Sequence, residues 1–197
     1  MDKIVYLVRH GLIRSNEEDV YAGRNSEKLT ERGKKHAEQL GREMQDWGIQ
    51  LIQASPLRRT VQTAEILNKY CNAQLVKDPG LIEIDLGPWT GLSKDEVRRR
   101  YPDHYKSWIE HPEDFEQPGV ESLESVRDRV VHSFERFLAS EPDRVAAFVT
   151  HSVAVKVAVL HYEKKPLNLY HKVDVPNLSV HRFIFQPGGN AQVVRLK

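Results

Sequence analysis

The chain has 197 residues, and its 29 lysines and arginines balance 28 acidic residues to a formal net charge of +1. This balance excludes a protein that binds nucleic acids or membrane surfaces through an overall positive charge. Its single cysteine, Cys71, excludes an intrachain disulfide and a cysteine-cage metal site, and is typical of a reducing compartment.

Short apolar runs alternate with helical patterns from the N-terminus onward. Residues 4–8 form a continuous apolar run, which predicts a central strand buried on both faces. A helix is expected from about Thr30, which can cap it, because apolar residues then recur at spacings of three and four as far as Trp47. Gly48 ends this helix, and residues 51–52 predict a second strand.

The next helix is expected to begin at Ser55 and Pro56, with Ser55 as its cap and Pro56 in its first position, and to reach about Tyr70. Residues 75–76 and 81–82 predict short extended pieces.

The remaining chain is predicted to hold a helical cap, two further helices, a second buried strand and a hairpin. These elements are the cap at 87–118, a helix along the apolar stripe from Leu123 to Phe137, a strand at 145–149, a helix at 152–162, and strands at 178–185 and 191–196 joined by a turn at 187–190.

Strands that alternate with helices predict an α/β protein: a three-layer α/β/α sandwich with a mostly parallel central sheet and the cap inserted over it. We expect a single domain over 1–197, because no linker or repeat divides the chain. The most apolar stretch, 145–160, is shorter than a membrane span and reads as buried core, and the N-terminus has no secretory pattern. A cytoplasmic location is therefore expected. The edge of the terminal hairpin could support a homodimer.

Two strand ends carry the same chemical signal. His10 and His151 each come directly after a predicted central strand, and parallel α/β sheets place their active sites at the carboxyl ends of the strands. Arg9 precedes the first histidine, and Gly11 follows it and lets the backbone approach a ligand closely. The two matching positions predict a site that contains both histidines.

The motifs around these residues resemble the histidine phosphatase superfamily, in its phosphoglycerate-mutase-like branch. They follow the order typical of that family and cover about residues 4–157. The matching segments are 7–11 with Asn16, 29–33 with Ala37, 55–60 with 62–64, 83–87 with Trp89 and Gly91, Gly119 with Glu121 and Ser122, and 150–151.

The resemblance implies a role for each matching residue. His10 would be the nucleophile that becomes a phosphohistidine, because a neutral imidazole is available near pH 7. Arg9 and Arg59 would hold the phosphoryl oxygens through their guanidinium groups, and Asn16 would add a neutral donor. His151 would complete the pocket as a cationic donor.

Glu83 would be the proton shuttle, which protonates the leaving group and then takes a proton from water. This role requires that burial or neighbouring charges raise its pKa. Of the two adjacent arginines, Arg59 is assigned to the pocket because it directly precedes Thr60, as in the family pattern. Arg58 is expected on a solvated helix face, where it could instead contact the rest of the substrate.

The chain departs from the family pattern at two places. Leu12 and Ile13 replace the usual acidic and hydroxyl residues after Gly11, which is expected to make the rim of the pocket more apolar. Ser152 replaces the glycine that usually follows the second histidine, where it would narrow the pocket or add a donor. Both changes are expected to alter selectivity and to leave activity intact.

The resemblance implies a metal-independent phosphatase that acts on small phosphomonoesters and needs no cofactor, with no nucleic-acid or membrane partner. Two alternatives remain. A cofactor-dependent phosphoglycerate mutase would use the same first step, although mutases tend to have longer chains. A non-catalytic phosphate-binding or regulatory protein is disfavoured because all of His10, Arg9, Arg59, Glu83 and His151 are retained. The other histidines show no metal-ligand spacing.

Overall fold

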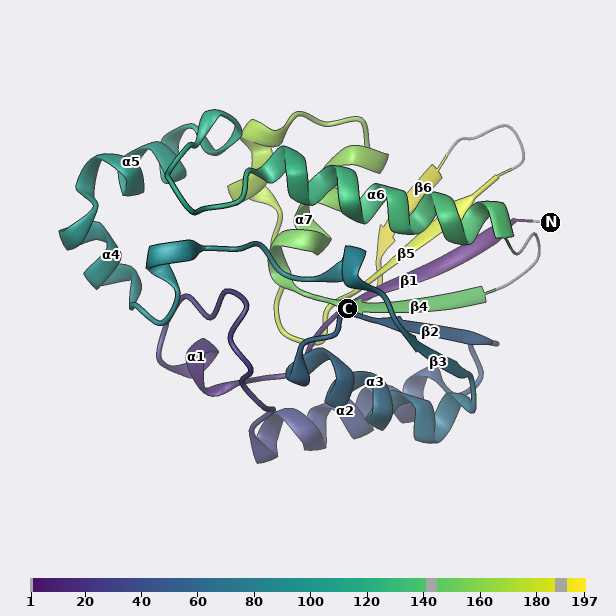
Figure 1. The fold of residues 1–197 in the computed structure, drawn as a ribbon. Helices are drawn as coiled ribbons and strands as arrows, with labels where there is room; N and C mark the ends of the chain where they lie inside the picture. The colour runs from purple at the N-terminus through teal and green to yellow at the C-terminus, as the bar shows by residue number, and fades with distance from the viewer. Residues whose placement is uncertain (1, 141–144, 187–190) are drawn as a thin grey trace.

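A computed structural model describes residues 2–140, 145–186 and 191–197. Within them a single sheet has the strand order β3-β2-β4-β1-β5-β6 (Figure 1). Strands β3, β2, β4 and β1 are parallel, whereas β5 runs antiparallel to β1 and to β6. The mostly parallel sheet is thus confirmed. The strands are β1 (Lys3–Arg9), β2 (Leu51–Ala54), β3 (Gln74–Lys77), β4 (Val145–Thr150), β5 (Val180–Phe185) and β6 (Ala191–Arg195).

Helices cover both faces of this sheet and form the outer layers of the predicted sandwich. Helices α2 and α3 lie on one face, and α6 and α7 lie on the other (Figure 1). The α-helices are α1 (Arg14–Glu17), α2 (Glu31–Met44), α3 (Arg58–Cys71), α4 (Lys94–Arg100), α5 (Pro102–Glu110), α6 (Leu123–Ser140) and α7 (Ser152–Tyr162). Short 3-10 helices are η1 (Pro79–Leu81), η2 (Gly87–Trp89), η3 (Pro112–Asp114) and η4 (Leu167–Lys172).

Strand β1 lies in the middle of the sheet, as its unbroken apolar run predicts. Alternate side chains of a strand point to opposite faces. Val5 and Leu7 accordingly pack in the core beneath α6 and α7, and Tyr6 and Val8 pack in the core beneath α2 and α3. This strand therefore joins the two cores and holds the residues that follow it in a fixed position.

The helix starts were predicted with mixed success. Thr30 caps α2, because its hydroxyl accepts a hydrogen bond from the Gly33 amide at 3.0 Å. Helix α3, however, begins at Arg58, and the prediction that Ser55 caps it is wrong. The Ser55 hydroxyl lies 2.7 Å from a ring nitrogen of His151, and Leu57 adopts an extended backbone at the helix start.

The extended piece predicted at residues 81–82 is wrong for Leu81, whereas Ile82 has an extended backbone. Leu81 ends the 3-10 helix η1, which Asp78 caps by accepting a hydrogen bond from the Gly80 amide at 2.9 Å. Pro79 occupies the first turn of η1, where its missing N–H costs no hydrogen bond. This local capping, rather than the two apolar residues, decides the conformation.

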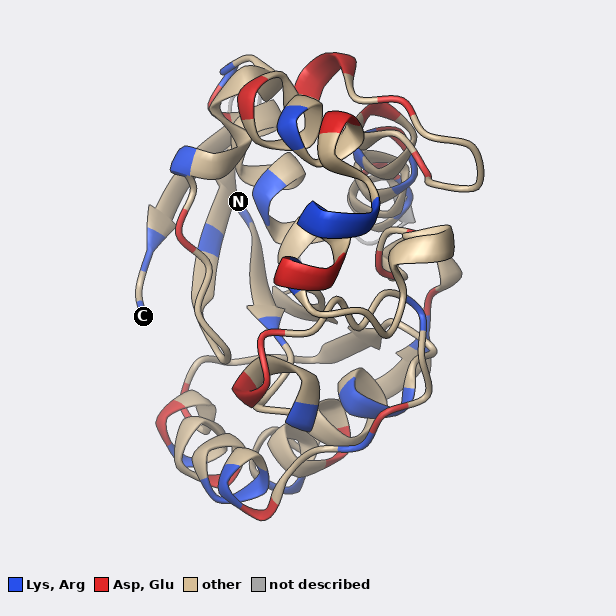
Figure 2. Cartoon of the chain, turned by 90° about the vertical axis from the view of Figure 1, so that its left-hand side faces the viewer, with Lys and Arg blue, Asp and Glu red and all other residues tan. Residues whose placement is uncertain are grey.

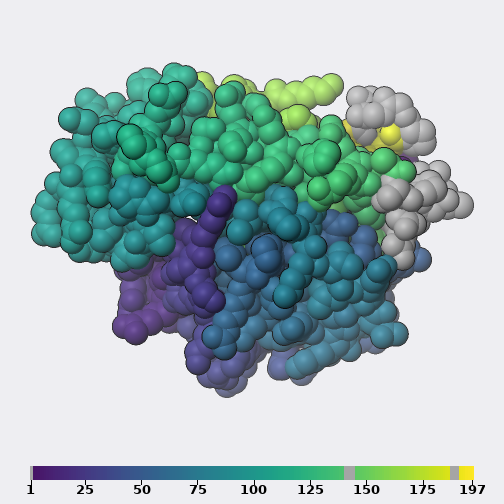
Figure 3. All heavy atoms as spheres, viewed as in Figure 1, coloured from purple at the N-terminus to yellow at the C-terminus, as the bar shows by residue number. Residues whose placement is uncertain are grey.

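The segment 87–118 contains η2, α4, α5 and η3, in keeping with a helical insertion. It forms one end of the molecule and adjoins the segment around α1 (Figure 3). Backbone hydrogen bonds join the two segments, from Tyr21 to Leu92 at 2.9 Å and from Lys94 to Asp19 at 3.2 Å. Trp89 is fully buried at the centre of this insertion among other aromatic rings.

Strands β5 and β6 pair antiparallel as the terminal hairpin predicted, while the turn predicted at 187–190 lies outside the described residues. None of the helices in the described part of the chain combines the length and apolar character that a bilayer crossing requires.

Candidate active site

A cavity of about 510 Å³ opens at the carboxyl ends of the parallel strands. Its lining includes five of the six residues predicted from the sequence: Arg9, His10, Asn16, Arg59 and Glu83. The insertion contributes Tyr105 and Trp108 to the opposite wall. Viewed toward this end of the molecule, acidic and basic segments are interspersed on the outer helices, in keeping with the balanced net charge (Figure 2). Inside the cavity, Arg9 and Arg59 lie together with His10 and Glu83.

The two histidines are brought together by the register of neighbouring strands. Arg9 of β1 pairs with Thr150 of β4, so the residue after each strand occupies an equivalent position. The His10 amide donates to the Thr150 carbonyl at 2.9 Å, which continues the strand pairing by one residue. The rings of His10 and His151 lie edge to face, with centroids 5.3 Å apart. Backbone pairing therefore sets the spacing of the two imidazoles.

His10 has one ring nitrogen committed and one free for chemistry. Its Nδ1 donates to the Gly11 carbonyl oxygen at 2.7 Å, which leaves Nε2 unprotonated in the neutral ring. Burial lowers the pKa of His10 well below its usual value, and the charges of Arg59 and Arg9 lower it further. The imidazole is thus a neutral nucleophile at pH 7.

His151 is completely buried and lies directly behind His10. The Nε–H of Arg59 points at His151 Nδ1 over 3.2 Å, so that nitrogen accepts and Nε2–H donates to the Ser55 hydroxyl at 2.7 Å. Burial and the Arg59 charge lower the pKa of His151 well below its usual value. In the unliganded protein a buried ring beside an arginine therefore favours the neutral form, and the cationic donor expected during phosphoryl transfer stays a prediction.

These two buried histidines should make stability depend on pH. Below pH 6.5 the unfolded chain protonates both rings, whereas their lowered folded-state pKa values keep them neutral, so stability is lost as pH falls. Glu83 acts oppositely, because its raised pKa makes the folded protein bind a proton first. His181, whose pKa burial lowers to about 4, acts in the same direction as the two active-site histidines, as do the partly buried His161 and His171. The histidines together outweigh one carboxyl, so we expect the free energy of unfolding to fall by roughly 2 kcal/mol per pH unit between pH 6.5 and 5.

Urea unfolding at pH 7, 6 and 5 measures this slope directly. Replacing His151 by glutamine removes one of the histidines that are neutral in the folded protein and protonated in the unfolded chain. The slope of stability against pH should therefore flatten in that variant. An equally steep loss of stability in His151→Gln would contradict the assignment.

Arg9 and Arg59 differ in how many of their donors are already hydrogen-bonded within the protein. Arg59 is almost fully buried and donates to the carbonyls of Gly23 and Asn25 at 2.6 and 2.9 Å, besides His151. Arg9 donates from Nη1 to the Val175 carbonyl at 2.6 Å, and its buried Nε has no partner among the described residues. Arg59 is therefore a fixed wall of the cavity, and Arg9 keeps a donor free for an anion.

Asn16 is held by a residue that the sequence did not single out. The Oδ1 of Asn16 accepts from the side-chain amide of Asn177 at 2.9 Å, and the same amide lies 3.1 Å from the His10 carbonyl. With its oxygen committed, Asn16 can offer only its amide nitrogen to a ligand. Asn177 lies in the loop before β5, with no motif or periodicity to mark it.

Glu83 lies on the segment between η1 and η2 and is 8% exposed. Its Oε1 accepts from the Ile84 amide at 2.9 Å. Burial raises the pKa of Glu83, although this hydrogen bond and the nearby Arg59 and Arg9 oppose the shift. The raised pKa that an acid role requires is thus present, with burial as its cause.

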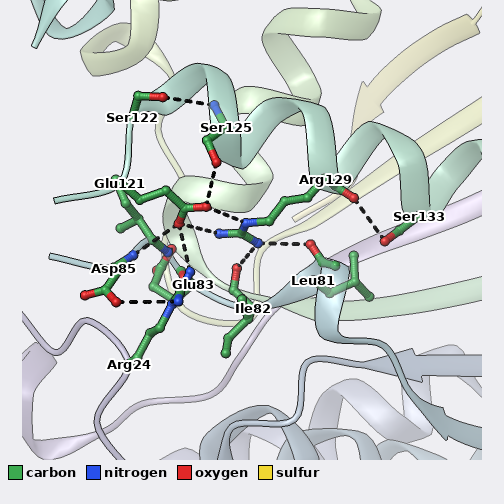
Figure 4. A network of polar contacts seen from close by, with 12 residues as sticks. Arg24, Leu81, Ile82, Glu83, Asp85, Glu121, Ser122, Ser125, Arg129 and Ser133 are labelled. Atoms are coloured by element: carbon green, nitrogen blue, oxygen red, sulfur yellow. Dashed lines mark hydrogen bonds and ion pairs between the residues drawn. The ribbon is translucent and has the colours of Figure 1, made fainter. Parts of the chain in front are cut away.

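A network of charged side chains holds this segment in place (Figure 4). Glu121 lies at its centre and accepts from Arg24 at 2.9 Å, and from Arg129 at 2.9 and 3.0 Å. Arg24 also donates to the Glu83 carbonyl at 3.0 Å, and Arg129 donates to the carbonyls of Gly80 at 3.0 Å and of Ile82. Both arginines therefore bind the backbone that carries Glu83.

We expect Glu121→Gln to lower kcat/KM by about tenfold, because the amide cannot pair two guanidinium groups and Glu83 loses its fixed position. The free energy of unfolding should fall by roughly 3 kcal/mol, as for other broken ion-pair networks with buried members. Steady-state kinetics and urea unfolding measure the two effects. Glu124→Gln, an exposed glutamate on α6, is the matched control and should change neither. Equal behaviour of the two variants would contradict the role of the network.

The structure also shows where the residues that depart from the family pattern lie. Ile13 is completely buried in the core against α2, and neither Leu12 nor Ile13 lines the cavity, so the expected apolar rim is wrong. Ser152 does line the cavity, at the start of α7. Arg58 is exposed on α3, as expected for a solvated helix face.

Comparisons with known proteins agree over most of the chain. The sequence profile of the histidine phosphatase superfamily (branch 1) matches residues 5–197. Phosphoserine phosphatase 1 of Hydrogenobacter thermophilus is 35% identical over 150 residues, which cover 76% of this chain and 71% of that protein. The "Probable phosphoglycerate mutase GpmB" of Erwinia tasmaniensis is 30% identical over 178 residues, 90% of this chain and 83% of that one. The solved structure of Bacillus stearothermophilus YhfR has a TM-score of 0.93 and 26% identity, and the match covers 98% of this chain and 96% of that one.

Proposed function

Because the chain belongs to the histidine phosphatase superfamily (branch 1) and is a phosphoric monoester hydrolase, we propose that it cleaves small phosphorylated metabolites through a phosphohistidine on His10. The observation that carries this proposal is the pairing of a neutral His10, whose Nε2 is free, with a buried Glu83 of raised pKa in one cavity. One residue supplies the nucleophile and the other supplies the proton.

In the first step the lone pair of His10 Nε2 attacks phosphorus, and the bond from phosphorus to the leaving oxygen breaks. Glu83 donates its proton to that oxygen, so the alcohol leaves neutral. The free Nε of Arg9 and a remaining Nη2 hydrogen of Arg59 stabilise the phosphoryl oxygens, with the Asn16 amide as a further donor.

In the second step a water attacks phosphorus as the bond to His10 Nε2 breaks, and Glu83 takes a proton from that water. Inorganic phosphate is released and both residues return to their starting states. A phosphate dianion next to His151 favours the protonated imidazole, so this histidine would become a charged donor only with substrate bound. The arginines supply the charge stabilisation that a metal ion gives other phosphatases, so the proposed reaction is metal-independent.

The experiment is a release assay with p-nitrophenyl phosphate in the presence and absence of EDTA. We expect turnover that is unchanged by the chelator. Loss of activity with EDTA and recovery with a divalent cation would contradict the metal-independent reaction.

A phosphoglycerate mutase is the second candidate, favoured by the Erwinia relative of that name. It would return the phosphoryl group from His10 to a bound phosphoglycerate instead of to water. Incubation with 3-phosphoglycerate and a catalytic amount of 2,3-bisphosphoglycerate, which primes His10 with a phosphoryl group, separates the two. A phosphatase releases inorganic phosphate, and a mutase forms 2-phosphoglycerate faster than it releases phosphate. We expect phosphate release to dominate.

A further inference from the structure

Helix α7 carries a lysine where the rest of the helix is core. From Val153 to Leu160, Lys156 is the one residue that is not buried, in the run Val-Ala-Val-Lys-Val-Ala-Val-Leu. Ser152 and Lys156 are four residues apart and so share one face of the helix, and both line the cavity. A partly buried ammonium costs free energy unless its charge is compensated. The lysine therefore faces the cavity for a reason other than packing.

Among the described residues, no carboxylate lies within ion-pair distance of Lys156. Its Nζ lies over the ring of Tyr170, 4.5 Å from the centroid, and this ring in turn packs on Trp108 at 5.1 Å. Lys94, which lines the same cavity, differs because its Nζ lies 2.5 Å from Asp19. Burial lowers the pKa of Lys156 and the charge of Arg9 lowers it further, while the carboxylates of Asp174 and Glu83, which lie beyond ion-pair distance, oppose the shift.

The lysine lies beyond the residues proposed for phosphoryl transfer. Tyr170 is buried and lines the same cavity as Arg9 and Glu83, and its ring face contacts Lys156. A ligand that extends from His10 past Tyr170 therefore reaches the ammonium group. Such a ligand would meet aromatic surface on the way and a single positive charge at the end.

We propose that Lys156 binds a second anionic group of the substrate, a carboxylate or a second phosphate, while the phosphoryl group to be cleaved lies against His10 and Arg9. This inference rests on the proposed function and narrows its substrates to small phosphomonoesters with two anionic groups. The second anion supplies the counter-ion that the protein itself does not provide. A substrate that ends in a hydroxyl leaves the ammonium unpaired.

Binding to the inactive His10→Ala variant tests the proposal without dependence on turnover. Isothermal titration calorimetry would compare 3-phosphoglycerate with sn-glycerol 3-phosphate, which differ by a carboxylate in place of a hydroxymethyl group. A second pair, propane-1,3-diol bisphosphate and its monophosphate, tests a second phosphate in the same way. In at least one pair, we expect the compound with two anionic groups to bind about 10- to 100-fold more tightly than the compound with one. The pair that shows the preference identifies the anion.

The preference for the compound with two anionic groups should disappear in His10→Ala/Lys156→Met, which keeps most of the length of the lysine side chain and removes its charge. Lys156→Arg should restore part of it, and Lys94→Met, the control that removes another lysine lining the cavity, should retain it. No preference in His10→Ala, or a preference that survives Lys156→Met, would overturn the proposal. A Lys156-dependent preference in a protein that cannot hydrolyse p-nitrophenyl phosphate would support this subsite and contradict the phosphatase function instead.

Discussion

Replacing His10 by alanine is expected to lower kcat for p-nitrophenyl phosphate by at least about 10⁴-fold, because no other group can form the covalent intermediate. Its neighbour His151 cannot substitute for it. Both ring nitrogens of His151 are engaged, Nδ1 by Arg59 and Nε2 by Ser55, and the ring is completely buried.

Two measurements make this prediction decisive. Rapid quench into alkaline detergent with a phosphate-labelled substrate should trap a phosphoenzyme in the wild-type protein and none in His10→Ala, and the label should be stable to base and lost in acid, as expected of a phosphohistidine. His36→Ala, which removes an exposed histidine from α2, should retain full activity. Undiminished turnover or labelling in His10→Ala would overturn the nucleophile assignment.

Replacing Glu83 by glutamine is expected to produce an effect that depends on the leaving group. For an alkyl phosphate such as sn-glycerol 3-phosphate, kcat/KM should fall by about 10² to 10⁴, because the alkoxide departs without a proton. For p-nitrophenyl phosphate the fall should be about tenfold or less, since p-nitrophenolate is stable as an anion. The parameter kcat/KM is the right one, because it reports the reaction only as far as departure of the leaving group.

The pH profile gives a second view of the same carboxyl group. Glu83 must be protonated, so kcat/KM should decline as pH rises through its raised pKa, and this decline should disappear in Glu83→Gln. Glu116→Gln, an exposed glutamate of the insertion, is the matched control. Equal slowing of both leaving groups in Glu83→Gln would count against its role as an acid.

The strands and the residues that follow them were predictable because their signals are local. An unbroken apolar run such as that of β1 has few alternatives to a central strand, and a histidine directly after it lies at the edge where parallel sheets place their ligands. Arg9 and His10 line the cavity for this reason, whereas Glu83, on the segment between η1 and η2, was assigned only through the family motif.

The predictions that failed concern residues whose structural partners lie far away in the sequence. Ser55 has a side chain suited to capping, but it lies against His151, 96 residues away, so α3 starts later. The charge state of His151 in the unliganded protein likewise follows from burial and from Arg59, and neither can be read from Thr-His-Ser alone. Ile13 enters the core because an isolated bridge joins it to Leu29, which no periodicity indicates.

The supporting residues were also beyond sequence reasoning, with one exception. Glu121 was noticed only through the family motif, and its partners Arg24 and Arg129 look like ordinary surface arginines in the sequence. Lys156 interrupts an apolar helix, and that irregularity alone carried a signal. A charged residue in the middle of an otherwise apolar helix or strand indicates a functional position even before the fold is known.

The strand order has a consequence for how the protein is made. Strand β1 emerges from the ribosome before the other strands of the sheet, yet it pairs with β4 and β5, whose residues follow about 140 and 175 positions later. Until then Val5, Leu7 and their neighbours form an apolar segment with unsatisfied edges, which is the kind of segment that chaperones shield. His10 acquires its neighbour His151 only when β4 docks. Nascent chains that end before β4 should therefore be inert toward phosphate esters, so catalysis begins only after β4 has been synthesised.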